Sequence, residues 1–271
     1  MAILIGGGTA QAQTVPAEAQ SDKGAPAAAP AAPAATPTWT ITDSGAIVSQ
    51  YRFRGISQSD NKPAVQGAFT IAHASGFYLS AWGSSASGDN AVNIGSTEID
   101  VYGGYTHALG KSGLTIDAGL YGYIYPGSAK AVGINEDYYE VYGSLAKAFG
   151  PVTLKVGANW APDQRYFKAF ATPTRYNVYE YGELSYAFAQ LPITLHSHIG
   201  HTGGGLDYAA HDYIDYTVGA GYKWKALTFD VSLVGTNLSR ADTRAADLAF
   251  GTNDFHRAAK RVAVGSVTAS F

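Results

Sequence analysis

The feature that most constrains this chain is an alternation of apolar and polar residues, repeated in about a dozen short segments between Trp39 and Phe271. Alternation with a period of two is typical of a strand with one buried face. The connections between the segments are alternately short and long, as in a barrel whose turns lie on one side of a membrane and whose loops lie on the other. The pattern therefore predicts an all-β fold: an antiparallel up-and-down transmembrane β-barrel of twelve strands.

The predicted strands are separated by glycine- and proline-rich turns, because these residues suit the backbone angles of tight turns. An even number of strands returns the C-terminus to the side where the barrel begins, and that side carries the short turns. We expect this side to face the periplasm. The twelve strands are predicted to span residues 39–53, 64–73, 77–84, 98–109, 114–125, 137–149, 152–160, 175–188, 193–201, 211–224, 227–238 and 259–271.

Composition excludes several classes of protein. The 271 residues include no cysteine, so disulfides and thiolate metal sites are impossible. The net charge of −3 gives no reason to expect nucleic acid as a partner. No run of apolar residues is long enough for a transmembrane helix, but barrel strands show only every second residue to lipid. A soluble β-sandwich or propeller is the alternative, and no cofactor is predicted.

The N-terminal part divides into two segments ahead of the barrel. Residues 1–12 resemble the remnant of a signal peptide, since an apolar stretch precedes the small-x-small pattern Ala10-Gln11-Ala12. A disordered tail is the alternative, because a positively charged segment is missing. Residues 13–37 are rich in alanine and proline and are expected to be a disordered linker. Residues 38–271 are then the barrel domain.

The parity of the strands sorts their residues into two faces. Because an unpaired lysine or arginine at the bilayer midplane costs about 2–4 kcal/mol, the apolar face must point outward and the polar face must line the lumen. A slight acidic excess predicts a weak preference for cations, while the alternative is that these charges pair and plug the lumen. The candidate lumen residues are Arg52, Arg54, Glu98, Asp100, Asp117, Glu140, Lys155, Asp215, Lys223 and Asp230.

Some residues do not follow the simple parity. Glu180 shares its face with apolar residues, and Val262 is out of phase with Val267, so bulges are predicted at Gly182 and Gly265. Aromatic residues near strand ends are expected to form two girdles at the membrane surfaces. These residues are Trp82, Tyr125, Trp160, Tyr222 and Trp224.

Arg52 and Arg54 have the same parity at the end of the first predicted strand. They could form a basic constriction that binds an anionic solute, or they could pair with lumen carboxylates and hold the strand in register. His196 and His198 share a face and could bind a metal ion or respond to pH, but ordinary lumen or loop polarity explains them more simply, because no third metal ligand has a convincing spacing. No serine forms a recognisable motif with a base, so the chain is not expected to be an enzyme.

The string Tyr51–Asp60 (YRFRGISQSD), with Ser75–Tyr78 and Glu98–Tyr105, resembles the TorF family of porins over about Ser49 to Tyr105. The resemblance implies a Gram-negative outer-membrane barrel with an undefined solute. The terminal Phe271 resembles the signal that such barrels present to the barrel-assembly machinery, although Ala269 and Gly265 depart from the family pattern.

The expected function is passive diffusion of small hydrophilic solutes or ions through a porin, surrounded by outer-membrane lipid and lipopolysaccharide. A closed structural or adhesive barrel is the first alternative, and a barrel lipid hydrolase is the second.

Overall fold

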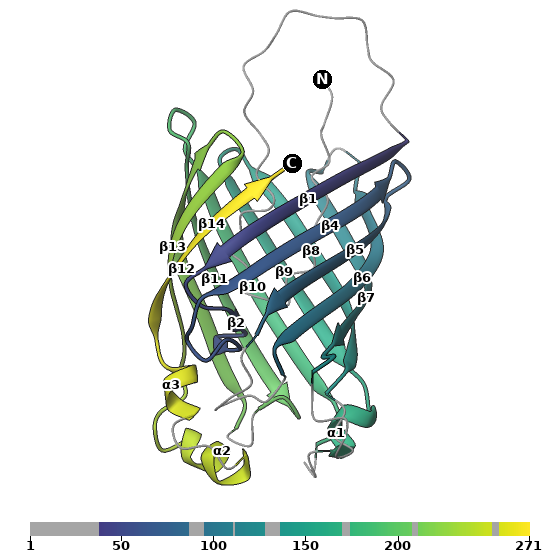
Figure 1. Cartoon of the computed structure of the whole chain (residues 1–271). Coiled ribbons are helices and arrows are strands. Elements are labelled where there is room, and N and C mark those ends of the chain that lie inside the picture. The colour runs from purple at the N-terminus through teal and green to yellow at the C-terminus, as the bar shows by residue number, and fades with distance from the viewer. Residues whose placement is uncertain are drawn as a thin grey trace, which may run out of the picture.

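Twelve antiparallel strands close into a single barrel in the computed structural model, which confirms the predicted fold and strand number (Figure 1). The structure describes residues 38–86, 95–110, 112–127, 136–169, 174–207, 211–250 and 255–271, so the predicted signal remnant and linker lie outside the described residues. The barrel strands are β1 (Trp39–Val48), β4 (Ala64–His73), β5 (Phe77–Ser85), β6 (Thr97–Ala108), β7 (Leu114–Ile124), β8 (Tyr138–Phe149), β9 (Val152–Ala161), β10 (Asn177–Ala187), β11 (Ile193–Gly204), β12 (Tyr213–Trp224), β13 (Leu227–Thr236) and β14 (Val262–Ser270).

The barrel closes where the first strand meets the last. β1 pairs with β14 from Ser44 opposite Ser270 to Val48 opposite Ser266, and on its other edge it pairs with β4 along its whole length. Over this stretch, closure leaves the sheet without a free edge, as strands that cross a hydrocarbon layer require. The first residues of β1, 39–42, extend past the end of β14 and pair with β4 alone. The start of β1 and the end of β14 lie at the same end of the barrel (Figure 1).

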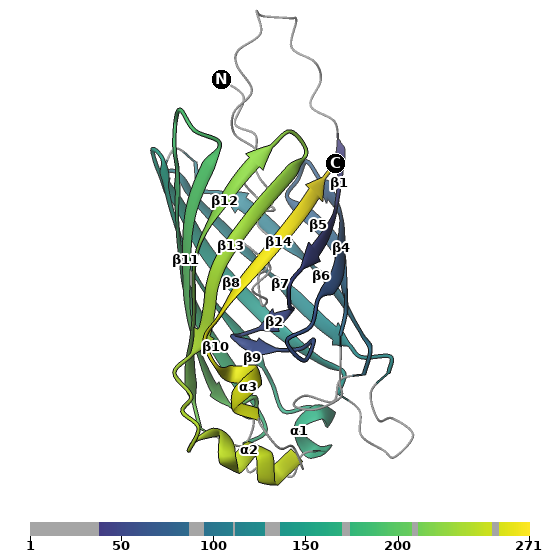
Figure 2. The same ribbon diagram turned by 60° about the vertical axis from the view of Figure 1, so that its left-hand side comes forward.

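The two ends of the barrel differ in their connections. The end that holds the C-terminus carries short turns, such as 150–151 and 225–226. The other end carries the long connections and three short helices, α1 (Arg165–Ala169), α2 (Thr243–Phe250) and α3 (Phe255–Ala259) (Figures 1 and 2). Within the described ranges, none of these helices has the length and apolar character to cross a membrane.

Apolar side chains point outward and polar side chains point inward, the reverse of a water-soluble barrel. On β13, for example, Val231 is 66% exposed while its neighbours Asp230 and Ser232 are buried. The alternation gives one exposed apolar row per strand, and large exposed side chains cover the outer face. They include Ile41, Ile47, Val65, Leu79, Leu120, Val156, Ile199, Val218 and Leu233.

The predicted bulges are wrong. β10 keeps one register with both neighbours through Gly182, and β14 keeps one register with β13 through Gly265. Glu180 therefore faces outward, with its Oε2 3.5 Å from Nδ1 of His201. It lies near the start of β10, at the end of the barrel that carries the long loops. A charge near a membrane surface costs little, so no bulge is needed to hide it.

Two of the five aromatic residues expected in the girdles lie elsewhere. Trp82 and Tyr125 are buried on the lumen side, where they pack in a cluster with other tyrosines. Trp160, Tyr222 and Trp224 are about half exposed on the outer face, as a girdle requires. Nearness to a strand end does not determine the face of a residue, because parity does.

The first strand is shorter than predicted, and this difference shapes the interior. β1 ends at Val48 rather than at residue 53, and the connection to β4 turns into the barrel as a small hairpin of β2 (Arg52–Phe53) and β3 (Ile56–Ser57) (Figures 1 and 2). We call residues 50–61 the lumenal hairpin. Arg52 and Arg54 thus belong to this hairpin and not to the barrel wall.

The outward apolar face generates a first prediction. Val231→Arg places a charge at the middle of β13 and is expected to lower the free energy of unfolding in lipid vesicles by about 2–4 kcal/mol. Leu227→Arg, on the same face but at the strand end, is expected to cost only ~0–1 kcal/mol. Equal penalties at the two positions would show that this face is not embedded in lipid.

Candidate functional site in the barrel lumen

The lumenal hairpin packs against one wall of the barrel through aromatic rings. The Tyr51 ring lies 5.3 Å from that of Trp82 on β5, and the Phe53 ring lies 5.6 Å from that of Tyr123 on β7. Stacked tyrosines continue this wall, since the Tyr123 and Tyr138 rings are 4.3 Å apart. Such ring pairs hold the hairpin by area burial and by edge-to-face contact.

The tip of the hairpin reaches the opposite wall. Gly55 has a positive φ of 79°, and a Cβ atom there would lie 2.6 Å from Thr236 Cγ2 on β13 and 2.9 Å from Asp215 Cβ on β12. Only glycine fits so close an approach. Because the hairpin touches β5 and β7 on one side and β12 and β13 on the other, it crosses the lumen.

Arg54 forms the polar centre of the crossing. Its Nη2 donates to both carboxylate oxygens of Glu140 on β8, at 2.7 and 2.8 Å, and both side chains are almost fully buried. The same carboxylate accepts hydrogen bonds from Tyr123 Oη at 3.2 Å and from Asn159 Nδ2 at 2.9 Å. A buried ion pair of this kind is stable only when its remaining hydrogen bonds are satisfied, and Glu140 meets that condition.

The faces of the Arg54 guanidinium are covered by rings. Its Cζ lies 4.1 Å from the ring centre of Tyr179 on β10 and 4.7 Å from that of Phe53. Nε and Nη1 of Arg54 have no hydrogen-bond partner among the described residues. The guanidinium is therefore stabilised by one carboxylate and by two aromatic rings.

Arg52 holds the hairpin in shape rather than forming a constriction. Its guanidinium donates to the side chains of Gln50 and Asn61 and to the backbone oxygens of Gly55 and Lys260, at distances between 2.6 and 3.0 Å. Three of these acceptors belong to the hairpin itself. The fourth, Lys260, follows α3 and ties the hairpin to the connection before β14.

Further contacts fix the hairpin to α3. The Arg257 guanidinium pairs with the buried carboxylate of Asp60, and Asn61 Nδ2 donates to the Arg257 backbone oxygen at 3.2 Å. The long connection before β14 thus covers the open side of the lumenal hairpin, and the two segments form one unit at this end of the barrel.

A group of carboxylates and tyrosines lines the wall beside the hairpin. Tyr121 Oη donates to Asp100 at 2.8 Å and Tyr125 Oη donates to Glu98 at 3.3 Å. Both carboxylates, on β6, have no exposed surface. The phenols supply the hydrogen bonds that make buried carboxylates tolerable.

A second group lies on β9 to β12. His198 stands between two carboxylates, with Nδ1 3.6 Å from Glu183 and Nε2 3.2 Å from Asp215. Lys155 Nζ lies 3.7 Å from Glu183, and Tyr179 Oη is 2.7 Å from His198 Nε2. Tyr179, whose ring also packs against the Arg54 guanidinium, thus links this group to Arg54. Glu183 was not predicted as a lumen residue, although its parity with Lys155 across the β9–β10 pair could have identified it.

His196 belongs to a third group. Its Nε2 lies 2.7 Å from Asp230 Oδ2, and Ser232 Oγ donates to Asp230 Oδ1 at 2.5 Å. Asp230 thus lies between the serine and the histidine and contacts both. His201 faces outward beside Glu180, which separates it from the two lumen histidines.

The predicted lumen residues are distributed as follows. Every one except Lys223 is buried inside the barrel, and Lys223 has an exposed side chain at the end of β12. The structure joins Arg54 with Glu140, and it joins Lys155 and Asp215 through Glu183 and His198. Asp117 accepts a hydrogen bond from Tyr78, whose hydroxyl also contacts that of Tyr142.

At the end with long loops, two connections meet through an ion pair. His211 Nε2 lies 3.4 Å from Asp242 Oδ1. A hydrogen bond to the backbone oxygen of Asp212, with the Asp242 carboxylate, raises the pKa of His211 above its usual value. The pair favours contact between these loops when the imidazole is protonated.

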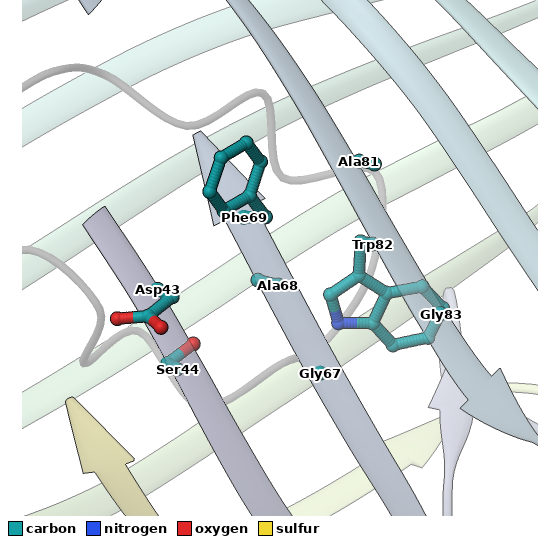
Figure 3. Close-up of a pocket in the computed structure, with 8 residues that line it drawn as sticks. All are labelled: Asp43, Ser44, Gly67, Ala68, Phe69, Ala81, Trp82 and Gly83. Carbon is teal, nitrogen blue, oxygen red and sulfur yellow. The ribbon is translucent and has the colours of Figure 1, made fainter. Parts of the chain in front are cut away.

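The pocket shown in Figure 3 lies on the wall and not in the lumen centre. Its volume is about 430 Å³, and it arises because small residues of β4 and β5, such as Gly67, Ala81 and Gly83, leave space beside Phe69 and Trp82 (Figure 3). Asp43 and Ser44 of β1 complete it. This open hollow holds no cluster of polar groups and is not the candidate site.

A bacterial protein family matches most of the chain. A family model described as "Bacterial protein of unknown function (Gcw_chp)" matches residues 31–271. No curated protein matches the chain. The resemblance of Tyr51–Asp60 to TorF porins stays a prediction.

Solved porin structures share the architecture at low sequence identity. The structure titled "KdgM porin" has a TM-score of 0.53 at 14% identity, and that titled "NanC porin structure in rhombohedral crystal form" has a TM-score of 0.54 at 11% identity. Each match covers 86% of this chain and 99% of the other. A third structure, titled "KdgM porin in complex with disordered oligogalacturonate", has a TM-score of 0.51 at 15% identity.

The Arg54–Glu140 pair generates a second prediction. Arg54→Met leaves a buried carboxylate without its cation and is expected to lower the free energy of unfolding by about 3–5 kcal/mol. Adding Glu140→Gln should recover part of this loss, because the uncompensated charge is removed. Lys62→Met is the matched control, since its ion pair with Asp60 is more than half exposed on the lysine side and should contribute less than about 1 kcal/mol.

Denaturant titration of the folded barrel measures these free energies. An Arg54→Met variant that loses no more stability than Lys62→Met would contradict the interpretation that the buried pair holds the hairpin.

Proposed function

The chain belongs to the Gcw_chp family of bacterial proteins of unknown function, and we propose that it is an outer-membrane channel for small hydrophilic solutes with a preference for cations. The proposal starts from the distribution of polarity. A closed barrel with apolar residues outside and charged residues inside suits a lipid environment and a polar path. The porin-like architecture supports the same function.

The outer face supports a place in the outer membrane of a Gram-negative bacterium. Trp160, Tyr222 and Trp224 are positioned near strand ends, where aromatic rings favour the headgroup level. Lipid and lipopolysaccharide would cover the apolar rows between them.

The observation that carries the cation preference is the excess of carboxylates in the lumen. A narrow tube with low-dielectric walls focuses the field of its charges, so an acidic lining concentrates cations. The inward acidic side chains are Glu98, Asp100, Asp117, Glu140, Glu183, Asp215 and Asp230, against Arg52, Arg54 and Lys155.

The charge balance also argues against a polyanionic solute. One similar porin is described in complex with oligogalacturonate, an acidic sugar chain. In the present lumen, Arg54 pairs with Glu140, and Lys155 lies beside Glu183. No basic track follows the described wall, so a polyanion would meet repulsion along its path.

A closed structural or adhesive barrel is a second candidate, and the lumenal hairpin favours it. Residues 50–60 are all buried, and they cross the lumen between opposite walls. In the described conformation the hairpin spans the lumen at this level. A hairpin in this position narrows or closes the path through the barrel, and conductance measurements separate the two candidates.

The third prediction concerns selectivity. Purified protein in a planar bilayer under a KCl gradient should show a reversal potential with the sign of a cation-selective channel. Asp117→Asn with Asp230→Asn should shift that potential towards zero, because both carboxylates face the lumen. Asp43→Asn removes the same charge from the exposed outer face and should leave the potential unchanged. A reversal potential on the anion side would contradict the proposed preference.

The fourth prediction concerns the hairpin. Replacing residues 50–60 with a short glycine–serine connection should raise the single-channel conductance several-fold, roughly in proportion to the lumen area that is freed. The barrel should remain folded, as judged by heat-dependent mobility in gel electrophoresis. If neither this variant nor the natural chain conducts, the barrel is closed and the proposed channel function is wrong.

A further inference from the structure

The surroundings of Arg54 have the composition of a binding site for an organic cation. One carboxylate accepts hydrogen bonds from the guanidinium, and the guanidinium Cζ lies over the rings of Tyr179 and Phe53. Carboxylates and ring faces are the groups that recognise guanidinium by charge-assisted hydrogen bonds and cation–π contact. We call Glu140, Asn159, Tyr123, Tyr179 and Phe53 the guanidinium cage.

Four of the five cage residues belong to the barrel wall. Tyr123, Glu140, Asn159 and Tyr179 come from β7, β8, β9 and β10, which are consecutive neighbours in the sheet. Only Phe53 is contributed by the hairpin. The wall part of the cage therefore stays in place if the hairpin leaves.

The wall residues are also held by their own contacts. Tyr123 and Asn159 donate to Glu140, and Tyr179 Oη contacts His198 and Asp215 at 2.7 and 3.2 Å. These bonds do not involve Arg54. A cage that is organised by the wall alone can accept another guanidinium with little rearrangement.

Arg54 itself is held in an unfavourable backbone conformation. Its φ is +45°, in the left-handed region that residues with a side chain rarely adopt. Arg54 and Gly55 are the two residues that connect β2 to β3, and a two-residue hairpin turn requires positive φ at both positions. The turn therefore places Arg54 at the hairpin tip, where its side chain reaches Glu140.

The nearby charges favour a cation and not an anion in this position. Asp215 lies beside the hairpin tip at Gly55, and Tyr179 connects it to the cage. Removing Arg54 would leave Glu140 with no cation among its described contacts. An incoming guanidinium restores the balance, whereas a neutral molecule of the same shape does not.

We propose that the guanidinium cage is a binding site for small solutes that carry a guanidinium group, and that Arg54 is its built-in occupant, which such a solute displaces. The role of this site in transport rests on the proposed channel function, because displacing Arg54 would release the hairpin from the wall of the channel. The binding itself is a separate property and is measured separately.

The binding experiment uses methylguanidinium and methylurea, which share a planar shape and differ in charge. Isothermal titration of the purified full chain with Arg54→Ala should show saturable binding of methylguanidinium, at least about tenfold tighter than that of methylurea. The natural chain should bind at least about tenfold more weakly than the variant, because Arg54 competes. Adding Glu140→Gln to Arg54→Ala should remove the preference for the cation.

Folding of each variant is checked by heat-dependent gel mobility. If Arg54→Ala does not fold, the chain with residues 50–60 replaced by a glycine–serine connection provides the same open cage without Phe53, and the same preference for methylguanidinium is expected. The proposal is overturned if methylurea binds as tightly as methylguanidinium, or if Glu140→Gln leaves the binding unchanged.

Conductance distinguishes this proposal from the channel function. Methylguanidinium should reduce the single-channel current of the Arg54→Ala variant, and methylurea should not. A variant that conducts but neither binds nor is blocked by methylguanidinium refutes the cage and leaves the channel intact. A variant that binds methylguanidinium but does not conduct refutes the channel and leaves the cage intact.

Discussion

The Arg54–Glu140 ion pair is the interaction on which the interior of this barrel depends. It joins the tip of the lumenal hairpin to β8, in surroundings from which water is excluded. A buried pair contributes little net stability compared with an apolar substitute, but losing one partner is costly. The pair therefore acts mainly by fixing one arrangement of the hairpin, against a wall whose tyrosines and carboxylates are held by their own hydrogen bonds.

The strands and their faces could be predicted because lipid imposes a simple rule. Outward positions at the middle of the bilayer must be apolar, and this requirement gives the period of two that is visible between Thr97 and Ser270. The twelve strands, the side of the short turns and the inward position of residues such as Glu98 and Asp230 all follow from that rule.

The lumenal hairpin could not be predicted from the same rule. Arg52 and Arg54 continue the parity of β1, so alternation alone extends the strand beyond Val48. The turn at Arg54 and Gly55 has the left-handed backbone angles of a two-residue hairpin loop. Its place in the lumen depends on contacts with β8, β10 and β12 far along the chain. Parity alone also leads to the wrong bulge at Gly182, because it ignores how deep a residue lies in the membrane. Glu180 is an outward charge near a strand end, and such a charge needs no bulge.

The chain offers a direct measurement of the hairpin's position, since it has no cysteine of its own. In a Ser57→Cys variant, a single thiol replaces a hydroxyl that is 2% exposed within the hairpin. The account predicts that a water-soluble thiol reagent modifies this cysteine far more slowly than one placed at the exposed Lys62, and that Arg54→Ala removes the protection. Equal modification rates at the two positions in the otherwise natural chain would contradict the conclusion that the hairpin is held inside the barrel.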